Sequence, residues 1–330
     1  MMKFLKIFFF LFLLVGTIII LRNHQTESKL DYRVAEGKIF GTQYRVVYES
    51  SVSLDSVIRK ALLDVDNSLS MFNNASTLAR INRGETACVD SLFCLVFNVS
   101  KQVNVATEGA FDPTVAPAVN AWGFGIESKQ TLSATQLDSI AELVDFSKVC
   151  IEGDSVIHRE DLRIRLDFGA VAKGFGVDCV AETLRQCRVE NFMVEIGGEV
   201  VVNGVNDKGE VWRIGVQKPT SDGAAIQEVI KLSNAAMATS GNYRNYYITE
   251  DGKRIAHTID PRTVSPVAHS LLSATVVAPT CAIADAYATA FMVMGVEATK
   301  ECLKHHPELS VYLIYQENES LQVYSTLPDL

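Results

Sequence analysis

The sequence predicts an α+β or irregular α/β fold, formed as one domain that follows a hydrophobic N-terminal segment. Stretches with the apolar spacing of helices alternate irregularly with stretches typical of strands along the 330 residues. No regular βαβ repeat with a glycine-rich first turn emerges, and no proline- or glycine-rich linker divides the chain. With 48% hydrophobic residues, the chain has enough apolar material for one large core or two small ones.

The expected elements follow directly from these patterns. Helical spacing predicts helices over 53–69, 91–106, 133–143, 171–186 and 281–294, the last of them ending at Gly295. Strand patterns cover 44–48, 156–167, a hairpin within 191–204, 212–217, 273–278 and 310–316.

The first 26 residues differ from the rest of the chain. Lys3 and Lys6 precede an unbroken apolar run over 7–21, and Arg22 closes it. The run is short for a transmembrane helix, but no pair of small residues marks a cleavage site after it. We therefore expect residues 1–26 to be a retained signal anchor rather than a cleaved signal peptide. A linker over 27–37 and a single domain over 38–330 complete the chain, and the two lysines place the domain outside the cytoplasm.

Composition excludes some classes of function. Without the three basic residues of the N-terminal segment, the domain carries 27 basic and 39 acidic residues, a net charge of −12. Such a surface repels nucleic-acid backbones, so no nucleic-acid partner is expected. The seven cysteines form no CxxC motif and no cluster with histidine, which disfavours zinc. Cys88 and Cys94 could form a disulfide across a turn, and most of the other cysteines are predicted to be buried thiols.

One acidic residue lies within an apolar helical stretch, TCAIADAYATAFMVMG over 280–295. Because this helix should be buried on nearly every side, Asp285 needs a cation or several hydrogen-bond donors. Thr289 follows four residues later and lies on the same face. Carboxylate, hydroxyl and carbonyl oxygens suit Mg²⁺. The alternative is that Asp285 binds neighbouring loop amides, since two residues do not define a metal site.

Three further motifs contain residues that could bind a ligand or act in catalysis. LDFGAVAKGFGVD over 166–178 joins a strand to a helix through glycines and carries Lys173, which suits phosphate binding or an ordinary tight turn. HTIDPRT over 257–263 makes His257 the best candidate base, while Asp260 and Arg262 could form a plain salt bridge within a turn. GAFDPT over 109–114 could stack on a heterocycle or form a core loop.

The order of the motifs is more specific than any one of them. From residue 41 onward the chain contains GTQYRV, SMFN, TLARIN, GAFDPTVAP, LDFGAVAKGFGVD, VEIGGE, WRIGVQKP, ATSGNYRN, HTIDPRT and APTCAIADAYATA. This series resembles the FAD:protein FMN transferases of the ApbE family over residues 35–326. The resemblance implies a compact α+β domain with a mixed sheet and flanking helices. It also implies a Mg²⁺-dependent enzyme that transfers FMN from FAD to a Thr or Ser of an acceptor protein and releases AMP.

The resemblance also implies roles for individual residues. Metal ligands would be the side chains of Asp285 and Thr289 and the backbone oxygens of Ala170 and Ala288, and His257 matches the family's base. FAD contacts would come from Phe40, Phe72, Ala110, Phe111, Asp112, Asp167, Lys173 and Ile259. Two positions depart from the pattern: Phe40 replaces a common Met, and Val264 replaces a frequent Gly beside the His257 loop.

The implied setting is the extracytoplasmic face of a bacterial inner membrane. Typical acceptors of the family are flavin-carrying subunits of membrane redox pumps. Two other functions remain open from the sequence: an FAD pyrophosphatase, in which water replaces the acceptor hydroxyl, and a non-catalytic flavin carrier. The chemistry of pyrophosphate cleavage suits the residues present, because Mg²⁺ and Lys173 would neutralise phosphate charge.

Overall fold

The computed structural model describes residues 31–125, 133–153, 155–219, 225–242, 246–248, 254–318 and 320–328. The expected N-terminal anchor over 1–26 lies outside these residues. An eight-stranded sheet forms the centre, with the strand order β1-β2-β5-β6-β9-β14-β15-β16 and every neighbouring pair antiparallel. The sheet strands are β1 Asp31–Ile39, β2 Thr42–Ser50, β5 Phe192–Ile196, β6 Glu199–Asn203, β9 Ala235–Gly241, β14 Leu271–Ala278, β15 Ser310–Glu317 and β16 Ser320–Ser325.

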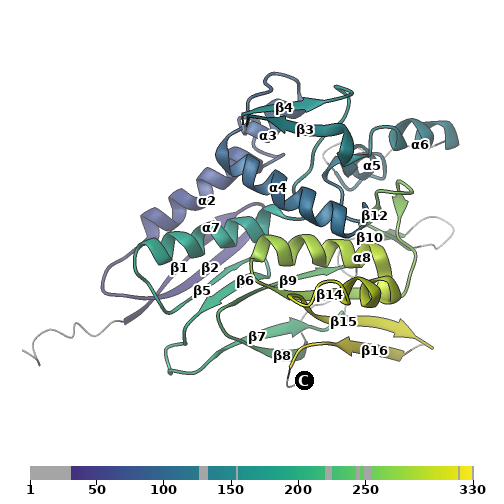
Figure 1. Cartoon of the computed structure of the whole chain (residues 1–330). Coiled ribbons are helices and arrows are strands. Elements are labelled where there is room, and N and C mark those ends of the chain that lie inside the picture. The colour runs from purple at the N-terminus through teal and green to yellow at the C-terminus, as the bar shows by residue number, and fades with distance from the viewer. Residues whose placement is uncertain are drawn as a thin grey trace, which may run out of the picture.

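Helices cover one face of this sheet (Figure 1). The long ones are α2 Asp55–Leu69, α4 Ser91–Ala106, α7 Ala172–Gln186 and α8 Cys281–Leu303; the short ones are α3 Thr77–Asn82, α5 Ala116–Ala121, α6 Ala134–Ala141, η1 Pro113–Val115 and η2 Phe146–Lys148. Two-stranded ribbons complete the fold: β3 Val149–Glu152 with β4 Val156–Arg159, β7 Trp212–Gln217 with β8 Ile226–Leu232, β10 Tyr246–Ile248 with β11 Arg254–Ala256, and β12 Ile259–Asp260 with β13 Ser265–Pro266. The α+β prediction is therefore confirmed, with a central sheet whose described strand pairs are all antiparallel where a mixed sheet was expected.

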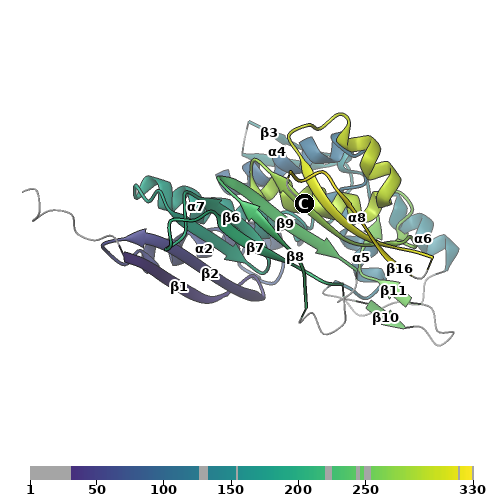
Figure 2. The same ribbon diagram turned by 90° about the horizontal axis from the view of Figure 1, so that it is seen from below.

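The two faces of the sheet pack against different layers. On β6, Val201 packs in a cluster with residues of α2 and α7, whereas Val200 and Val202 pack with Trp212 of β7. This alternation follows from the two-residue period of a strand. The β7–β8 ribbon thus covers the face opposite the helices, as the view from below shows (Figure 2).

Strand β1 corrects one expectation about the domain boundary. Residues 31–37 were expected to be linker, but they form most of β1, which pairs with β2 from Asp31↔Ser50 to Ile39↔Thr42. The strand lies at the edge of the sheet, and Ala35 is its buried residue. A polar edge strand is held by backbone hydrogen bonds rather than by an apolar face, so its sequence resembles a linker.

The segment after β4 corrects a second expectation. A strand was expected over 156–167, but β4 ends at Arg159. Ile164 and Leu166 are fully buried, in agreement with the alternating pattern. Leu166 nevertheless has no neighbouring strand: its N–H donates to Asn82 Oδ1 at 2.9 Å, and its carbonyl accepts from Asn82 Nδ2 at 2.8 Å. The side-chain amide of Asn82 thus makes the two backbone hydrogen bonds that a neighbouring strand would otherwise make with Leu166.

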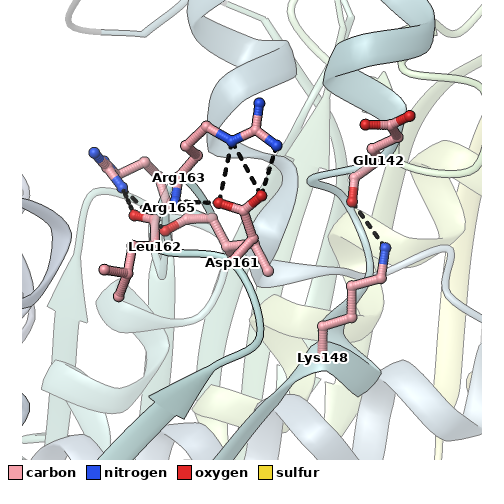
Figure 3. A network of polar contacts seen from close by, with 7 residues as sticks. Glu142, Lys148, Asp161, Leu162, Arg163 and Arg165 are labelled. Atoms are coloured by element: carbon pink, nitrogen blue, oxygen red, sulfur yellow. Dashed lines mark hydrogen bonds and ion pairs between the residues drawn. The ribbon is translucent and has the colours of Figure 1, made fainter.

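Side chains also shape the turn that precedes Leu166 (Figure 3). The N–H of Arg163 donates to Asp161 Oδ1 at 2.7 Å, and its guanidinium binds the same carboxylate. Arg165 Nη1 donates to the carbonyl of Leu162, and Lys148 Nζ donates to that of Glu142 at 2.8 Å. Aspartate readily forms such local turns. Side chains thus bind the backbone of Leu162, Arg163 and Leu166, while the N–H of Ile164 donates to the carbonyl of Asp161 at 3.1 Å.

The other expected elements are observed within a few residues of their predicted bounds, with one addition in α8. The break predicted at Gly295 is present, because this residue has φ 76° and ψ −178°. Helical turns then resume and continue to Leu303, which the sequence did not predict. Helix α8 is apolar and long enough to span a membrane by composition, but most of it is buried in this core. Cys88 is exposed and Cys94 is buried, and the two form no disulfide with each other.

Helices α7 and α8 cross closely at Gly174. A Cβ atom on this residue would lie 2.3 Å from the carbonyl oxygen of Cys281 and 2.8 Å from Cβ of Asp285. Asp178, one turn further along α7, accepts the N–H groups of Cys281 and Ala282 at 2.8 Å each. These bonds satisfy free amides at the start of α8 and attach the two helices to each other.

We therefore expect Gly174→Ala to lower the free energy of unfolding by about 3 kcal/mol, since the backbone of α8 must move to admit a methyl group. Chemical denaturation of the purified domain measures this change. Gly215→Ala in β7 is the matched control, because there the nearest atom to the new Cβ is the flexible end of Ile226 at 3.4 Å. Equal stability of the two variants would contradict the close crossing.

Candidate active site

One cavity gathers most of the residues singled out from the sequence. It has a volume of about 320 Å³ and is bounded by the 110–113 loop, the start of α7, the end of β9, the β11–β12 connection and α8. Ten of the thirteen predicted site residues line it: Ala110, Phe111, Asp112, Asp167, Ala170, Lys173, His257, Ile259, Asp285 and Thr289. Segments separated by more than 170 residues therefore meet at one site.

Asp285 is almost fully buried, as the apolar helix predicts, with 2% of its surface exposed. Its Oδ2 accepts the N–H of Gly174 at 3.0 Å, and its Oδ1 lies 3.6 Å from Lys173 Nζ. Asp285 thus binds an amide at the start of α7, as the alternative interpretation expects, and the cation beside it is the Lys173 ammonium. Binding of a metal ion by Asp285 stays a prediction. One turn later, Thr289 Oγ1 lies 3.1 Å from Ser240 Oγ at the end of β9.

Lys173 is shared between two carboxylates. Its Nζ lies 3.0 Å from Glu199 Oε1 and 3.6 Å from Asp285 Oδ1, and 31% of its side chain is exposed. Burial lowers the pKa of Lys173, but the charges of Asp285 and Glu199 outweigh this and raise it above the ordinary value. Burial raises the pKa of the Glu199 carboxyl above its ordinary value, and the charge of Lys173 opposes that shift. Lys173 is therefore held in its charged form.

The donor set around Asp285 fits a magnesium ion. It consists of one buried carboxylate, a threonine hydroxyl and the nearby backbone of Ala170, which are all hard oxygen donors. Within the described part of the chain, no three His, Cys, Asp or Glu side chains form a metal-binding group. Such a sparse set is typical of Mg²⁺ that also binds substrate phosphates. Ala288 is fully buried within α8 and is not among the cavity-lining residues.

Two further acids of the cavity have structural partners. Asp112 Oδ1 accepts both the N–H and the hydroxyl of Thr114, at 2.7 and 2.6 Å, and Oδ2 accepts the N–H of Phe146 at 3.0 Å. Burial raises the pKa of Asp112, and these bonds oppose the shift. Burial likewise raises the pKa of Asp167, whose Oδ1 accepts the N–H of Gly169 at 2.6 Å. Asp112 thus fixes the shape of the 110–114 loop.

Phe40 and Phe72 lie in a second hollow of about 190 Å³, which shares Asp167, Gly169 and Lys173 with the cavity. Phe72 is 80% exposed, an unusual state for a large aromatic ring and one suited to stacking on a ligand. Phe40 has φ 50° at the β1–β2 turn, and its ring packs against Gly176. The two predicted aromatic contacts are therefore near the cavity rather than in it.

His257 lines the cavity from the connection between β11 and β12. Its ring lies edge-on to Phe124, with 6.3 Å between centroids. The Asp260–Arg262 pair is a salt bridge within the same turn, at 2.9 Å.

Val264, which ends this turn, adopts the left-handed conformation with φ 47° that a glycine accepts without strain. Its carbonyl accepts Trp122 Nε1 at 2.9 Å, and its side chain is buried. The turn thus forms with Val264 in place of glycine, held by Trp122.

Sequence reasoning missed three polar residues of this region. Glu199 and Ser240 lie inside quoted motifs but were given no role, and Asp178 was treated only as the end of a glycine-rich segment. The available signal for Glu199 was its position: it is a charged residue between Gly197–Gly198 and the apolar run over 200–202. Its contact with Lys173 depends on the tertiary structure.

Comparisons with known proteins agree with this fold. A family model described as ApbE family matches residues 40–313. An FAD:protein FMN transferase of Haemophilus influenzae is 37% identical over 307 residues, which cover 88% of each chain. The protein of that name from Escherichia coli K12 is 34% identical over 318 residues, covering 92% of this chain and 88% of the relative.

Solved structures show the same relationship. The flavin transferase ApbE of Vibrio cholerae superposes with a TM-score of 0.81 at 32% identity, over 90% of this chain and 97% of the other. The Pseudomonas stutzeri flavinyl transferase ApbE, in its apo form, gives a TM-score of 0.81 at 28% identity, over 90% and 95% of the two chains. Since the family model spans most of the chain and the relatives align over nearly their whole length, the chain belongs to the ApbE family.

Proposed function

We propose that this protein is an FAD:protein FMN transferase that moves FMN from FAD to a Thr or Ser hydroxyl of an acceptor protein. The observation that carries the proposal is the single cavity lined by Lys173, His257 and Asp285, in a chain of the ApbE family. The curated relatives bear this name over the same length of chain, which supports a flavin dinucleotide as the substrate.

The proposed reaction is a phosphoryl transfer. The acceptor hydroxyl oxygen forms a bond to the FMN phosphorus, the bond between that phosphorus and the bridging oxygen breaks, and AMP leaves with the bridging oxygen. His257 takes the proton of the attacking hydroxyl, which is general-base catalysis. Lys173 offsets negative charge on the phosphates, and the exposed Phe72 offers an aromatic surface to a ring of FAD. Phe111 is buried in the core and contributes to the wall of the cavity.

We infer that Mg²⁺ is held by the side chains of Asp285 and Thr289 and by the backbone oxygens of Ala170 and Ala288. When bound, the ion would supply charge neutralisation at the phosphate oxygens. The burial of the Asp285 carboxylate, which lines the same cavity as Thr289, supports this, because a buried carboxylate needs a cation or several hydrogen-bond donors. Asp112, Asp167 and Ile259 would form the remaining wall of the FAD site.

The setting is proposed from the N-terminal sequence. Lys3 and Lys6 before the apolar run over 7–21 favour an anchored domain outside the cytoplasm of a bacterium, where a membrane redox pump would offer an acceptor subunit. We expect a protease added to spheroplasts to digest the C-terminal domain of a tagged chain. Protection of the tag until the membrane is lysed would place the domain in the cytoplasm instead.

The proposed function is tested by mass spectrometry of an acceptor domain co-expressed with this protein. The expected result is an added FMN on the acceptor, mapped to a Thr or Ser residue, in cells that also contain FAD. Incubation of the purified components with FAD and Mg²⁺ should release AMP in equal amount. Free FMN without acceptor modification would favour a pyrophosphatase, and FAD binding without AMP release would favour a carrier.

A further inference from the structure

Glu199 is a buried acid for which the proposed chemistry gives no role. It is the first residue of β6, and it lies on the same face as Val201, toward the helices. Only 2% of its surface is exposed. Its Oε1 lies 3.0 Å from Lys173 Nζ, while Oε2 has no hydrogen-bond partner among the described residues. A buried carboxylate with an unsatisfied oxygen is costly, so this position calls for a compensating role.

Stability alone does not account for the pair. Buried ion pairs contribute little net free energy, because the desolvation cost offsets the attraction between the charges. The geometry instead relates Glu199 to the cavity. Lys173 Nζ is closer to Glu199 than to Asp285, at 3.0 against 3.6 Å. Glu199 therefore competes with Asp285 for the ammonium group of Lys173. The Oε2 atom of Glu199 can accept a further hydrogen bond from that ammonium group.

The charge of Glu199 affects how Lys173 pairs with Asp285. Lys173 faces two carboxylates, and only Asp285 belongs to the set of oxygen donors that lines the cavity. If Glu199 were neutral, the ammonium would pair with Asp285 alone and oppose the binding of a divalent cation there. With Glu199 charged, the positive charge of Lys173 is already offset.

We propose that Glu199 is a positioning residue, which fixes Lys173 at the edge of the cavity so that the ammonium binds the phosphates of FAD while Asp285 stays available for a divalent cation. The inference rests on the proposed function, since it names FAD and Mg²⁺ as the ligands. Glu199 itself acts through Lys173 and contacts no substrate.

Glu199→Gln tests this proposal, with Glu195→Gln as the matched control. Glu195 lies on the same hairpin, and its Oε1 accepts the N–H of Gly198 at 2.8 Å, a bond that glutamine keeps. It lines a different hollow, bounded by β7. FAD affinity is measured by flavin fluorescence with and without Mg²⁺, the Mg²⁺ concentration for half-maximal AMP release is measured by turnover, and thermal unfolding reports on the fold.

We expect E199Q to weaken FAD binding in Mg²⁺ by about tenfold, as for the loss of one charge-assisted contact. It should also raise the Mg²⁺ requirement, while the protein stays folded because Lys173 keeps its contact with Asp285. In a Lys173→Met background, E199Q should have no further effect, because the residue acts through Lys173. E195Q should behave as the wild type in every measurement.

Three results would overturn the proposal: wild-type FAD affinity and Mg²⁺ requirement in E199Q, equal effects in E195Q, or effects that add to those of Lys173→Met. If E199Q does not fold, Glu199→Met replaces it, because an apolar side chain removes the desolvation cost together with the charge. Glu199→Met should show the same weaker FAD binding and higher Mg²⁺ requirement, and wild-type values of both would overturn the proposal. FAD affinity is read without an acceptor, so a failure of protein flavinylation leaves this test intact.

Discussion

Asp285→Ala is expected to abolish Mg²⁺-dependent turnover while the fold is retained. The carboxylate is the one buried charged group among the predicted oxygen ligands, and its loss removes charge stabilisation worth several kcal/mol at the phosphates, a decrease in kcat of about 10³-fold. Release of AMP from FAD over a range of Mg²⁺ concentrations measures the effect. Thermal unfolding checks the fold, since Lys173 keeps its contact with Glu199.

Asp285→Asn is the matched variant for this prediction. An asparagine oxygen can still accept the N–H of Gly174, so the contact between α7 and α8 is kept while the charge is lost. We expect the same loss of turnover with stability closer to that of the wild type. Undiminished activity of either variant at any Mg²⁺ concentration would remove Asp285 from the metal site.

His257→Ala is expected to lower kcat for flavin transfer by about 10²- to 10⁴-fold, the range for loss of a general base. FAD affinity should change little, because the cavity has other groups that face the phosphates and rings. Steady-state rates with a purified acceptor, together with fluorescence titration of FAD, separate the two quantities. Partial recovery with added imidazole would identify the lost group as a base.

His158→Ala is the control for the histidine experiment. His158 lies on β4, is half exposed, and pairs with Glu152 at 3.3 Å, outside the set of residues that line the cavity. Its removal should leave both kcat and FAD affinity unchanged. A wild-type rate in His257→Ala, or an equal loss of FAD binding and rate, would show that His257 supports the loop rather than the proton transfer.

Elements with local causes were predicted well from the sequence. The apolar spacing in 91–106 predicted α4 with its observed bounds, because a helix repeats its buried face within a few residues. The hairpin predicted within 191–204 is present as β5 and β6, and its turn is the glycine pair at 197–198, where both residues have positive φ. The apolar sequence around Asp285 predicted its burial, and the ordered motifs predicted most of the residues that line the cavity.

Elements with distant causes were not predicted. Leu166 alternates as a strand residue, yet its partner is the side chain of Asn82, 84 residues earlier in the chain. The edge strand β1 has little apolar face, so its pairing with β2 leaves no periodic signal. In both cases the backbone hydrogen bonds decide the structure, and these depend on which segment lies alongside.

The sequence by itself determined the α+β class, the family motifs, and a buried Asp285 next to a threonine on the same helical face. Only the tertiary structure decided that Lys173 lies between Asp285 and Glu199. It also decided that Val264 adopts the left-handed conformation that a glycine accepts without strain. The reason is physical: periodicity encodes which face of an element is buried, whereas contacts between charges depend on how distant elements cross. The close crossing at Gly174, which the sequence gives no means to foresee, brings Asp285 to Lys173.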